Sequence, residues 1–222
     1  MGVSVIYYQD DSVTIYHGDC REIVPTLGRF DLLLTDPPYG VDFIGKGTKH
    51  TRPGGGYLSG DSNIGPDVVQ TCLGSSKRAI VFPGIRLMRN YPQWDDCGAV
   101  YCPSGAGMGT WGFICFHPVL FYGPRPKRKG MYPTGMQSFD TVGQTEHPCE
   151  KPIQWIRWAI RLAGNDVLTI LDPFAGSGTT GRAAKDLGLK AVLIEIEERY
   201  CEIAANRMAQ EVLPMFGGES HG

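Results

Sequence analysis

The sequence lacks several features that would place it in particular protein classes. No run of about 18 apolar residues occurs among the 222 residues, so a membrane-spanning helix is excluded. The first residues, MGVSVIYYQDDS, contain no basic segment followed by an apolar stretch, which predicts a cytoplasmic protein without a secretory signal. The seven cysteines include no CxxC pair, so the closely spaced ligands of a zinc site are missing and no metal is expected.

The sequence has no large excess of either charge, because 21 basic and 23 acidic residues leave a net charge of −2. Binding to a nucleic acid would therefore need a local basic patch rather than an overall positive charge. Glycine, in contrast, is abundant, with 30 residues, about twice the usual ~7%. This content favours many tight turns over a helical bundle, while a hydrophobic share of 42% is enough for a substantial core.

Hydrophobic patterning predicts an α/β protein. In the first two thirds it predicts strands at 13–16, 31–35 and 79–83 and a weak helix at 67–75. It also predicts several short aromatic strands within 99–122. In the last third it predicts helices at 152–163, 179–187 and 196–212. Strands are predicted between them, at 166–172 and 191–195. Strands that alternate with helices indicate a mostly parallel sheet with helices on both faces.

A glycine-rich loop follows the expected strand that ends at Asp172. Gly176, Gly178 and Gly181 form a G-x-G-x-x-G between a strand and a helix, where missing side chains let a nucleoside approach the backbone. Glu195 ends the next expected strand, about 20 residues later, at the offset where a carboxylate binds ribose hydroxyls. The loop does not distinguish NAD, FAD and S-adenosylmethionine, and a glycine-rich packing turn is the structural alternative.

A second turn, Asp36-Pro37-Pro38-Tyr39, follows the expected buried strand at 31–35. Two prolines stiffen this turn and remove competing N–H donors, so the Asp36 carboxylate and the Pro37 carbonyl oxygen become fixed acceptors. Tyr39 adds an aromatic face. The set suits a planar group with an exocyclic amine, because two acceptors take its two N–H groups while the rings stack. An ordinary proline-rich turn with a capping aspartate is the alternative.

Three motifs in this order, TDPPYG at 35–40, HPCEKP at 147–152 and DPFAGSGTTG at 172–181, resemble those of the amino-group DNA methyltransferases. The order of DPPY before the glycine loop is similar to the permuted β class of that family. The resemblance covers the two ends of the chain, roughly 13–40 and 147–208. It implies a circularly permuted Rossmann-like fold in which the DPPY strand and the glycine-loop strand are neighbours.

The same resemblance implies S-adenosylmethionine as the cofactor and DNA as the partner, and it is compatible with a homodimer. We expect a single methyltransferase domain over 1–222, with a loop-rich target-recognition insert at about 41–66 and 123–146. Both segments lack hydrophobic periodicity, which predicts loops.

The resemblance also implies a set of site residues. Asp36, Pro37, Pro38 and Tyr39 would be catalytic. The cofactor-binding residues would be Asp19, Cys20, Asp36, His147, Lys151, Asp172, Phe174, Ala175, Gly176, Ser177, Gly178, Thr179 and Glu195. Cys149 stands where threonine is usual in the family, which removes one hydroxyl group. Asp19 has helix capping as its structural alternative, and Phe174 has core burial.

Two basic clusters are candidates for contacts with DNA phosphates, which need local positive charge. They comprise Lys46, Lys49 and Arg52 in a glycine-flanked loop, and Arg125, Lys127, Arg128 and Lys129 in the run RPKRK. A solvated surface run is the alternative. Trp94, Trp111 and Tyr132 are candidates for stacking on bases, although core packing is commoner for aromatic residues in short strands.

Taken together, these motifs predict methyl transfer from S-adenosylmethionine to N6 of a flipped adenine in DNA. N4 of cytosine is the alternative within the class, because DPPY favours adenine and SPPY is commoner for cytosine. Methyltransferases for RNA or protein amides usually carry NPPY. An NAD-linked oxidoreductase would use the glycine loop and Glu195 but leave DPPY and HPCEKP without a role. A catalytically inactive DNA-binding module would not need an intact Asp36.

Overall fold

The computed structural model describes residues 5–38, 64–105, 107–108, 110–128, 130–139 and 150–210. Within these ranges no helix is long and apolar enough to cross a membrane. The elements, in chain order, are β1 (Val5–Gln9), β2 (Val13–His17), α1 (Cys20–Ile23), η1 (Val24–Thr26), β3 (Phe30–Thr35), α2 (Ile64–Leu73), β4 (Ser76–Val81), η2 (Met88–Asn90), β5 (Asp96–Tyr101), β6 (Gly107–Met108), β7 (Phe113–Ile114), β8 (Phe116–Tyr122), β9 (Gly135–Gln137), α3 (Ile153–Ala163), β10 (Thr169–Asp172), α4 (Thr179–Asp186), β11 (Lys190–Glu195) and α5 (Glu198–Ala209).

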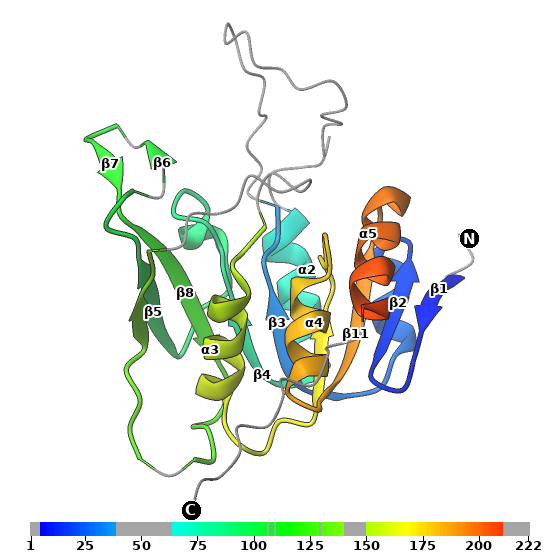
Figure 1. The fold of residues 1–222 in the computed structure, drawn as a ribbon. Coiled ribbons are helices and arrows are strands. Elements are labelled where there is room, and N and C mark those ends of the chain that lie inside the picture. Colours follow the sequence, from blue (N-terminus) through cyan, green and yellow to red (C-terminus); the bar gives the residue numbers. More distant parts are fainter. Residues whose placement is uncertain are drawn as a thin grey trace, which may run out of the picture.

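A nine-stranded sheet in the order β1-β2-β11-β10-β3-β4-β8-β5-β9 forms the centre of the protein (Figure 1). Strands β2, β11, β10, β3 and β4 are parallel, and β8 runs antiparallel to both β4 and β5. Strand β3 pairs with β10 through Leu32 with Ile170 and Leu33 with Leu171. The prediction that the DPPY strand and the glycine-loop strand are neighbours is therefore confirmed. We call the edge where the parallel strands end the carboxyl edge, and the opposite one the amino edge.

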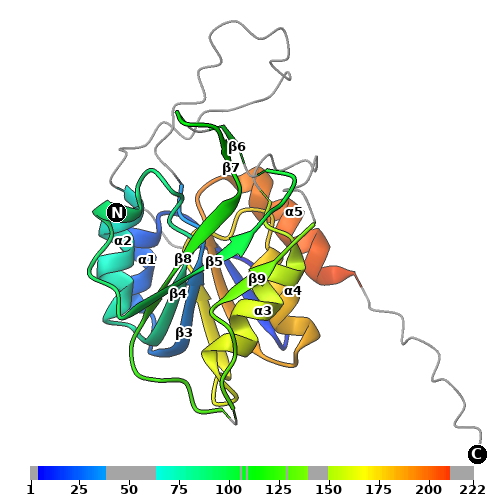
Figure 2. The ribbon, with the colours of Figure 1, turned by 90° about the vertical axis from the view of Figure 1, so that its left-hand side faces the viewer.

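Helices cover both faces of the sheet, as predicted. Leu32 and Leu34 of β3 belong to the core cluster that includes α3, α4 and α5, whereas Leu33 belongs to the cluster that includes α1 and α2. A parallel strand buried on both faces reads as a continuous apolar run rather than an alternating one, which explains the sequence DLLLT. Figure 2 shows the two helical layers on opposite sides of the sheet.

The structure corrects the predicted loops and adds elements. Helix α2 includes residues 64–66, and β9 interrupts 123–146, so the predicted target-recognition insert contains regular structure in both segments. The rest of that insert, at 41–63 and 140–146, lies outside the described residues. Strand β1 and the short helix α1 were not predicted. Among the described strands, β1 pairs only with β2, and it is largely exposed, so its sequence shows no clear alternation.

Candidate active site

Three segments predicted to form the site meet at the carboxyl edge. Asp36 follows β3, the glycine loop follows β10, and Glu195 ends β11. These strands are parallel neighbours, so their carboxyl ends lie together although the segments are distant in sequence. Ligands of open α/β sheets bind outside the carboxyl ends of the strands. The edge is therefore the candidate site.

Asp36 forms an ion pair with Lys151, whose Nζ donates a hydrogen bond to Oδ2. The Lys151 side chain is only 4% exposed, against 24% for Asp36. An ammonium group so enclosed needs an anionic partner, because its desolvation is otherwise uncompensated. Lys151 lies in the HPCEKP motif just before α3. The ion pair therefore holds Lys151 against the DPPY turn, a contact that no sequence motif predicts.

The DPPY turn packs against two residues that belong to no motif. A Cβ atom at Gly65 of α2 would lie 2.8 Å from Pro37 Cβ and 2.8 Å from the hydroxyl oxygen of Tyr91. Tyr91 is 5% exposed, and its hydroxyl group is one of the buried polar atoms of the described residues that have no hydrogen-bond partner. Burial, together with the nearby charge of Asp36, raises the pKa of Tyr91. Tyr91 and Gly65 thus fix one side of the turn.

The glycine loop combines close packing with unusual backbone conformation. Gly176 and Gly178 have φ angles of 51° and 80°, in the left-handed region that favours glycine. A Cβ atom at Gly178 would lie 2.8 Å from Ala204 Cβ of α5, and one at Gly181 would lie 2.6 Å from Leu193 Cδ1 of β11. The second and third glycines are thus needed for packing.

Glu195 closes the glycine loop from the end of β11. Its Oε2 accepts a hydrogen bond from Gly176 N at 2.8 Å, and its Oε1 accepts one from Glu197 N at 2.9 Å. The residue is 8% exposed; burial raises the pKa of its carboxyl group, against the lowering effect of the backbone donors. An ionised carboxylate has about four acceptor positions, so two remain for the hydroxyl groups of a ribose. The donor and acceptor set therefore fits a nucleoside.

Asp172 lies buried beneath the glycine loop. Its Oδ1 accepts hydrogen bonds from Thr35 Oγ1 at 2.7 Å and from Phe174 N at 3.1 Å. Thr35 immediately precedes Asp36, so Asp172 connects the two motif-bearing strands. Burial raises the pKa of Asp172 to about 6. A direct cofactor contact of Asp172 stays a prediction.

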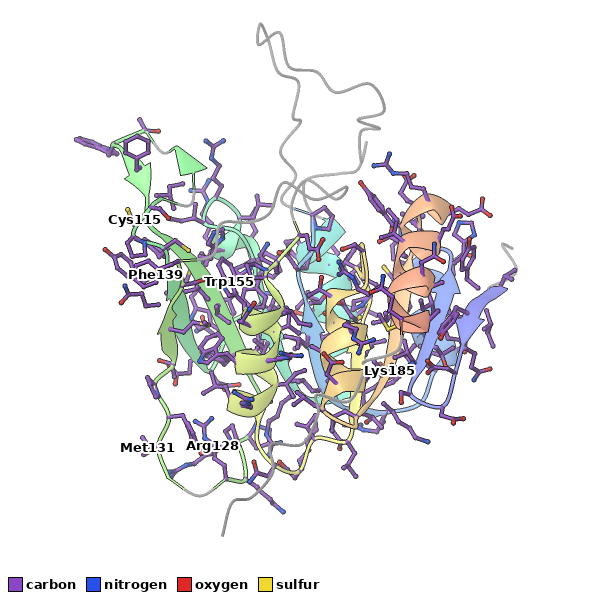
Figure 3. All side chains as sticks on the ribbon, viewed as in Figure 1. Cys115, Arg128, Met131, Phe139, Trp155 and Lys185 are labelled. Carbon is purple, nitrogen blue, oxygen red and sulfur yellow. The ribbon has the colours of Figure 1, made fainter. Side chains whose placement is uncertain are left out.

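His117 of β8 is a second titratable group near the site, and its side chain is partly buried. Its ring packs on Trp155 of α3 with centroids 4.8 Å apart, and its Nε2 is buried without a hydrogen-bond partner among the described residues. Burial, and then the charge of Lys151, lower the pKa of His117 to about 4, although Asp36 opposes this shift. His117 is therefore neutral at neutral pH. Figure 3 labels Trp155 on α3.

We expect Asp172 and His117 to give opposite pH dependences of stability. The pKa of Asp172 rises from 3.8 to about 6 on folding, so its contribution to the free energy of unfolding decreases as the pH rises through this window. The pKa of His117 falls from 6.5 to about 4, so its contribution is lost as the pH falls through that range. Each unit of pKa difference corresponds to roughly 1.4 kcal/mol.

Thermal melts between about pH 7 and pH 5 test this expectation. In Asp172→Asn the histidine acts alone, so the Tm should fall more steeply on acidification than in the unchanged protein. In His117→Gln the aspartate acts alone, so the fall should be smaller or reversed. The asparagine oxygen can still accept from Thr35 and Phe174, which makes the first variant conservative. Parallel pH profiles for all three proteins would contradict the two pKa shifts.

Arg207 of α5 also contributes to this edge, although no sequence motif marks it. Its Nη2 lies 2.5 Å from Glu150 Oε1, and its Nη1 donates to Thr179 Oγ1 at 2.8 Å. Glu150 directly precedes Lys151 in the sequence. The Glu150 side chain contacts α4 and α5, whereas the Lys151 side chain contacts Asp36. The described end of the HPCEKP motif, residues 150–152, is thereby held between the glycine loop and the DPPY turn. Arg207 lies in a helix without a motif, so no local signal identified it.

The remaining predicted cofactor residues have local structural roles. Asp19 is the N-cap of α1, and its Oδ1 accepts a hydrogen bond from Arg21 N at 2.8 Å, which confirms the capping alternative. Cys20 is buried, and burial raises the pKa of its thiol to about 12. Phe174 is partly buried against the core. Ala175 and Ser177 lie in the glycine loop, both buried. Cofactor contacts of these residues stay predictions.

Several predicted site residues fall in parts of the chain that the structure does not describe. They are Tyr39, Lys46, Lys49, Arg52, Lys129 and His147.

The described part of the basic run RPKRK lies at the amino edge, across the sheet from Asp36. The Lys127 carbonyl oxygen accepts a hydrogen bond from Asn165 N just before β10, and Arg128 Nη1 donates to the carbonyl oxygen of Leu162 at the end of α3. Arg128 thus caps a helix C-terminus, a structural role for a basic residue. Figure 3 shows Arg128 at the end of the molecule away from the β6–β7 hairpin. The predicted phosphate contacts of Arg125, Lys127 and Arg128 therefore lie away from the candidate site.

The three aromatic residues considered for base stacking occupy different surroundings. Trp111 is fully exposed between β6 and β7, in the hairpin that projects at the carboxyl edge in Figure 1. Tyr132 lies beneath the Arg128 guanidinium group, with 5.0 Å between Cζ and the ring centroid. Trp94 is partly buried against the core. Trp111 alone of the three is fully open to solvent at the carboxyl edge.

Comparison with known proteins agrees with this geometry. Residues 118–206 match a family model described as DNA methylase, of the N6 and N4 type. The Type II methyltransferase M.ScaI of Streptomyces caespitosus is 25% identical, over 95% of this chain and 86% of its own length. The putative methylase YubD of Escherichia coli (strain K12) is 26% identical, over 86% of this chain and 88% of its own.

Solved structures share the fold. The M1.HpyAVI–SAM complex has a TM-score of 0.65 at 19% identity, covering 89% of this chain and all of the other. PvuII DNA methyltransferase (cytosine-N4-specific) has a TM-score of 0.65 at 15% identity, covering 95% of this chain and 91% of its own. The strand order, the DPPY turn beside the glycine loop and the sequence matches thus agree: the chain has the fold of the amino-group DNA methyltransferases, those of the N6-adenine and N4-cytosine type, and resembles them in sequence.

Proposed function

We propose that this chain transfers a methyl group from S-adenosylmethionine to the exocyclic N6 amine of adenine in DNA. The observation that carries the proposal is the meeting of the Asp36 turn with the glycine loop and Glu195 at one sheet edge. Lys151 and Glu150 join these two halves of the site through the ion pairs described above. The shared fold with M1.HpyAVI, which was solved with SAM, and the similarity to M.ScaI support it.

The cofactor supplies a methyl group bound to a positively charged sulfur. Glu195 would bind its ribose hydroxyl groups, because the carboxylate is already oriented by two backbone N–H groups. Gly176 has no side chain, so the cofactor can approach the loop backbone closely.

Asp36 and the Pro37 carbonyl oxygen would orient the target amine. This nitrogen is a weak nucleophile, because its lone pair is delocalised into the ring. Hydrogen bonds from both N–H groups to these two acceptors favour a tetrahedral nitrogen, whose lone pair then points at the methyl group. The Asp36 carboxylate would also accept the proton that the nitrogen loses when it takes the methyl group. Positioning and electrostatic stabilisation provide most of the rate enhancement.

A base stacked in a duplex cannot reach Asp36, so the proposed reaction includes flipping of the target nucleotide. In the same proposal Tyr39 stacks on the flipped base, a contact typically worth about 1–3 kcal/mol. An NAD-linked oxidoreductase would leave the DPPY turn and its ion pair with Lys151 unused. The methyltransferase uses all three motifs, and we place its activity in a single domain.

Incubation of the protein with isotope-labelled S-adenosylmethionine and mixed-sequence DNA, followed by nucleoside mass spectrometry, tests the proposal. We expect labelled N6-methyladenine. Labelled N4-methylcytosine would instead assign the other target base of the same family. A folded protein that binds S-adenosylmethionine but labels no nucleoside in DNA would refute the proposed function.

A further inference from the structure

Two arginines at the carboxyl edge make no side-chain contact of the polar or ring type with the other described residues. Residues 82–95 begin where β4 ends, and β4 is parallel to β3, so this loop starts beside the DPPY turn. Arg86 and Arg89 are both exposed. Among the described residues, neither side chain forms a hydrogen bond, an ion pair or a ring contact.

Other described cations at this edge are already engaged. Arg21 pairs with Asp19, and Arg207 pairs with Glu150. Lys151 pairs with Asp36, and Arg199 lies over the ring of Tyr200. The positive charge left for an external anion at this edge, within the described residues, is therefore that of Arg86 and Arg89.

The loop that carries these arginines is fixed against the catalytic turn. Tyr91, which closes η2, approaches Gly65 with its hydroxyl group, and Gly65 in turn packs on Pro37. Ile85, Arg86, Met88, Arg89 and Trp94 line an open hollow of about 560 Å³. We call these five residues the Arg86–Arg89 surface. It offers two guanidinium groups beside apolar side chains, next to the site where the target base must arrive.

We propose that the Arg86–Arg89 surface binds the phosphate backbone of the substrate DNA beside the target base. Guanidinium groups form bidentate hydrogen bonds with phosphate oxygens. Two like charges three residues apart repel each other without a counter-ion, and phosphates would remove that repulsion. DNA that presents a base to Asp36 must approach the carboxyl edge, where this loop lies. The inference rests on the proposed function, because it takes DNA as the substrate.

The salt dependence of DNA binding tests the proposal. Binding of a fluorescein-labelled mixed-sequence duplex would be measured over a range of salt concentrations for the unchanged protein and for Arg86→Gln/Arg89→Gln. Each lost phosphate contact lowers the log–log slope by roughly 0.9, so the double variant should lose about 1.8. The charge-preserving pair Arg86→Lys/Arg89→Lys should keep most of the slope. The dissociation constant for S-adenosylmethionine should stay unchanged in both variants.

A matched control removes the same charge elsewhere. Arg29 precedes β3 and Lys190 begins β11, so both exposed residues lie at the amino edge. The slope of Arg29→Gln/Lys190→Gln should equal that of the unchanged protein. Two results would overturn the proposal: an unchanged slope in Arg86→Gln/Arg89→Gln, or an equal loss of slope in the control pair. In either case the proposed function would stand, provided that the unchanged protein methylates DNA. Failure of the proposed function would appear differently, as an unchanged protein that neither binds nor methylates the duplex.

Discussion

Replacement of Asp36 by alanine is expected to slow methyl transfer by roughly 100-fold or more, the cost of losing one well-placed electrostatic group. The proposed mechanism gives the carboxylate two tasks, orienting the amine and accepting its proton. Both concern the reacting nitrogen, and the contact with the cofactor that the family resemblance implies for Asp36 is expected to add little to affinity. The dissociation constant for S-adenosylmethionine should therefore change little, while the single-turnover rate at saturating cofactor should fall.

The ion pair with Lys151 complicates the single substitution. The Lys151 side chain is 4% exposed and would lose its Asp36 partner, and breaking a buried pair from one side typically costs about 3–5 kcal/mol. A carboxylate at a strand end in a cleft is rarely part of the core, so the position of Asp36 in the sequence gives no reason to expect that Asp36→Ala destabilises the fold. The structure instead predicts a lower Tm for this variant.

The double variant Asp36→Ala/Lys151→Met separates catalysis from stability. It removes both charges together, so its Tm should exceed that of Asp36→Ala, while its rate should remain at least as low. Single-turnover methylation and thermal melts of the two variants and of Lys151→Met provide the comparison. A folded Asp36→Ala protein with a rate within a few-fold of the unchanged enzyme would refute the role of Asp36.

Local sequence patterns predicted the parts of the site that each lie within one segment. The apolar run before Asp36 and the glycine spacing before α4 identified two strand ends, and parallel pairing of β3 with β10 joins them. Contacts between distant segments left no such signal. The ion pairs of Lys151 with Asp36 and of Arg207 with Glu150 link residues far apart in sequence, so only the fold reveals them.

The basic residues illustrate the same limit. The run RPKRK has the highest local density of positive charge, yet its described part lies at the amino edge, and Arg128 there caps α3. Arg86 and Arg89 are separated by two apolar residues and form no run. Local charge density does not show at which edge of a sheet a loop lies, nor which cations already have partners. That information comes from the strand order and the hydrogen bonds.

Replacement of Glu195 is expected to give the largest loss of cofactor affinity. Its two carboxylate oxygens each accept one backbone N–H, from Gly176 and from Glu197. Alanine leaves both donors without this acceptor and removes the proposed ribose contacts. Hydrogen bonds to charged groups contribute about 1.5–3 kcal/mol each, so the dissociation constant for S-adenosylmethionine should rise by roughly 10- to 100-fold or more.

Glutamine at this position should also weaken binding, although it has nearly the same shape. Each oxygen of Glu195 already faces an N–H donor, so either orientation of the amide places its NH2 group against one of them. Glu197→Gln is the matched control, because this exposed side chain carries the same charge two residues away. Titration calorimetry should show weaker binding for Glu195→Gln and unchanged binding for Glu197→Gln.

Ribose contacts are shared by the ground state and the transition state, so the rate at saturating cofactor should change less than the affinity. If Glu195→Ala and the unchanged protein bind S-adenosylmethionine with equal affinity, Glu195 does not bind the ribose.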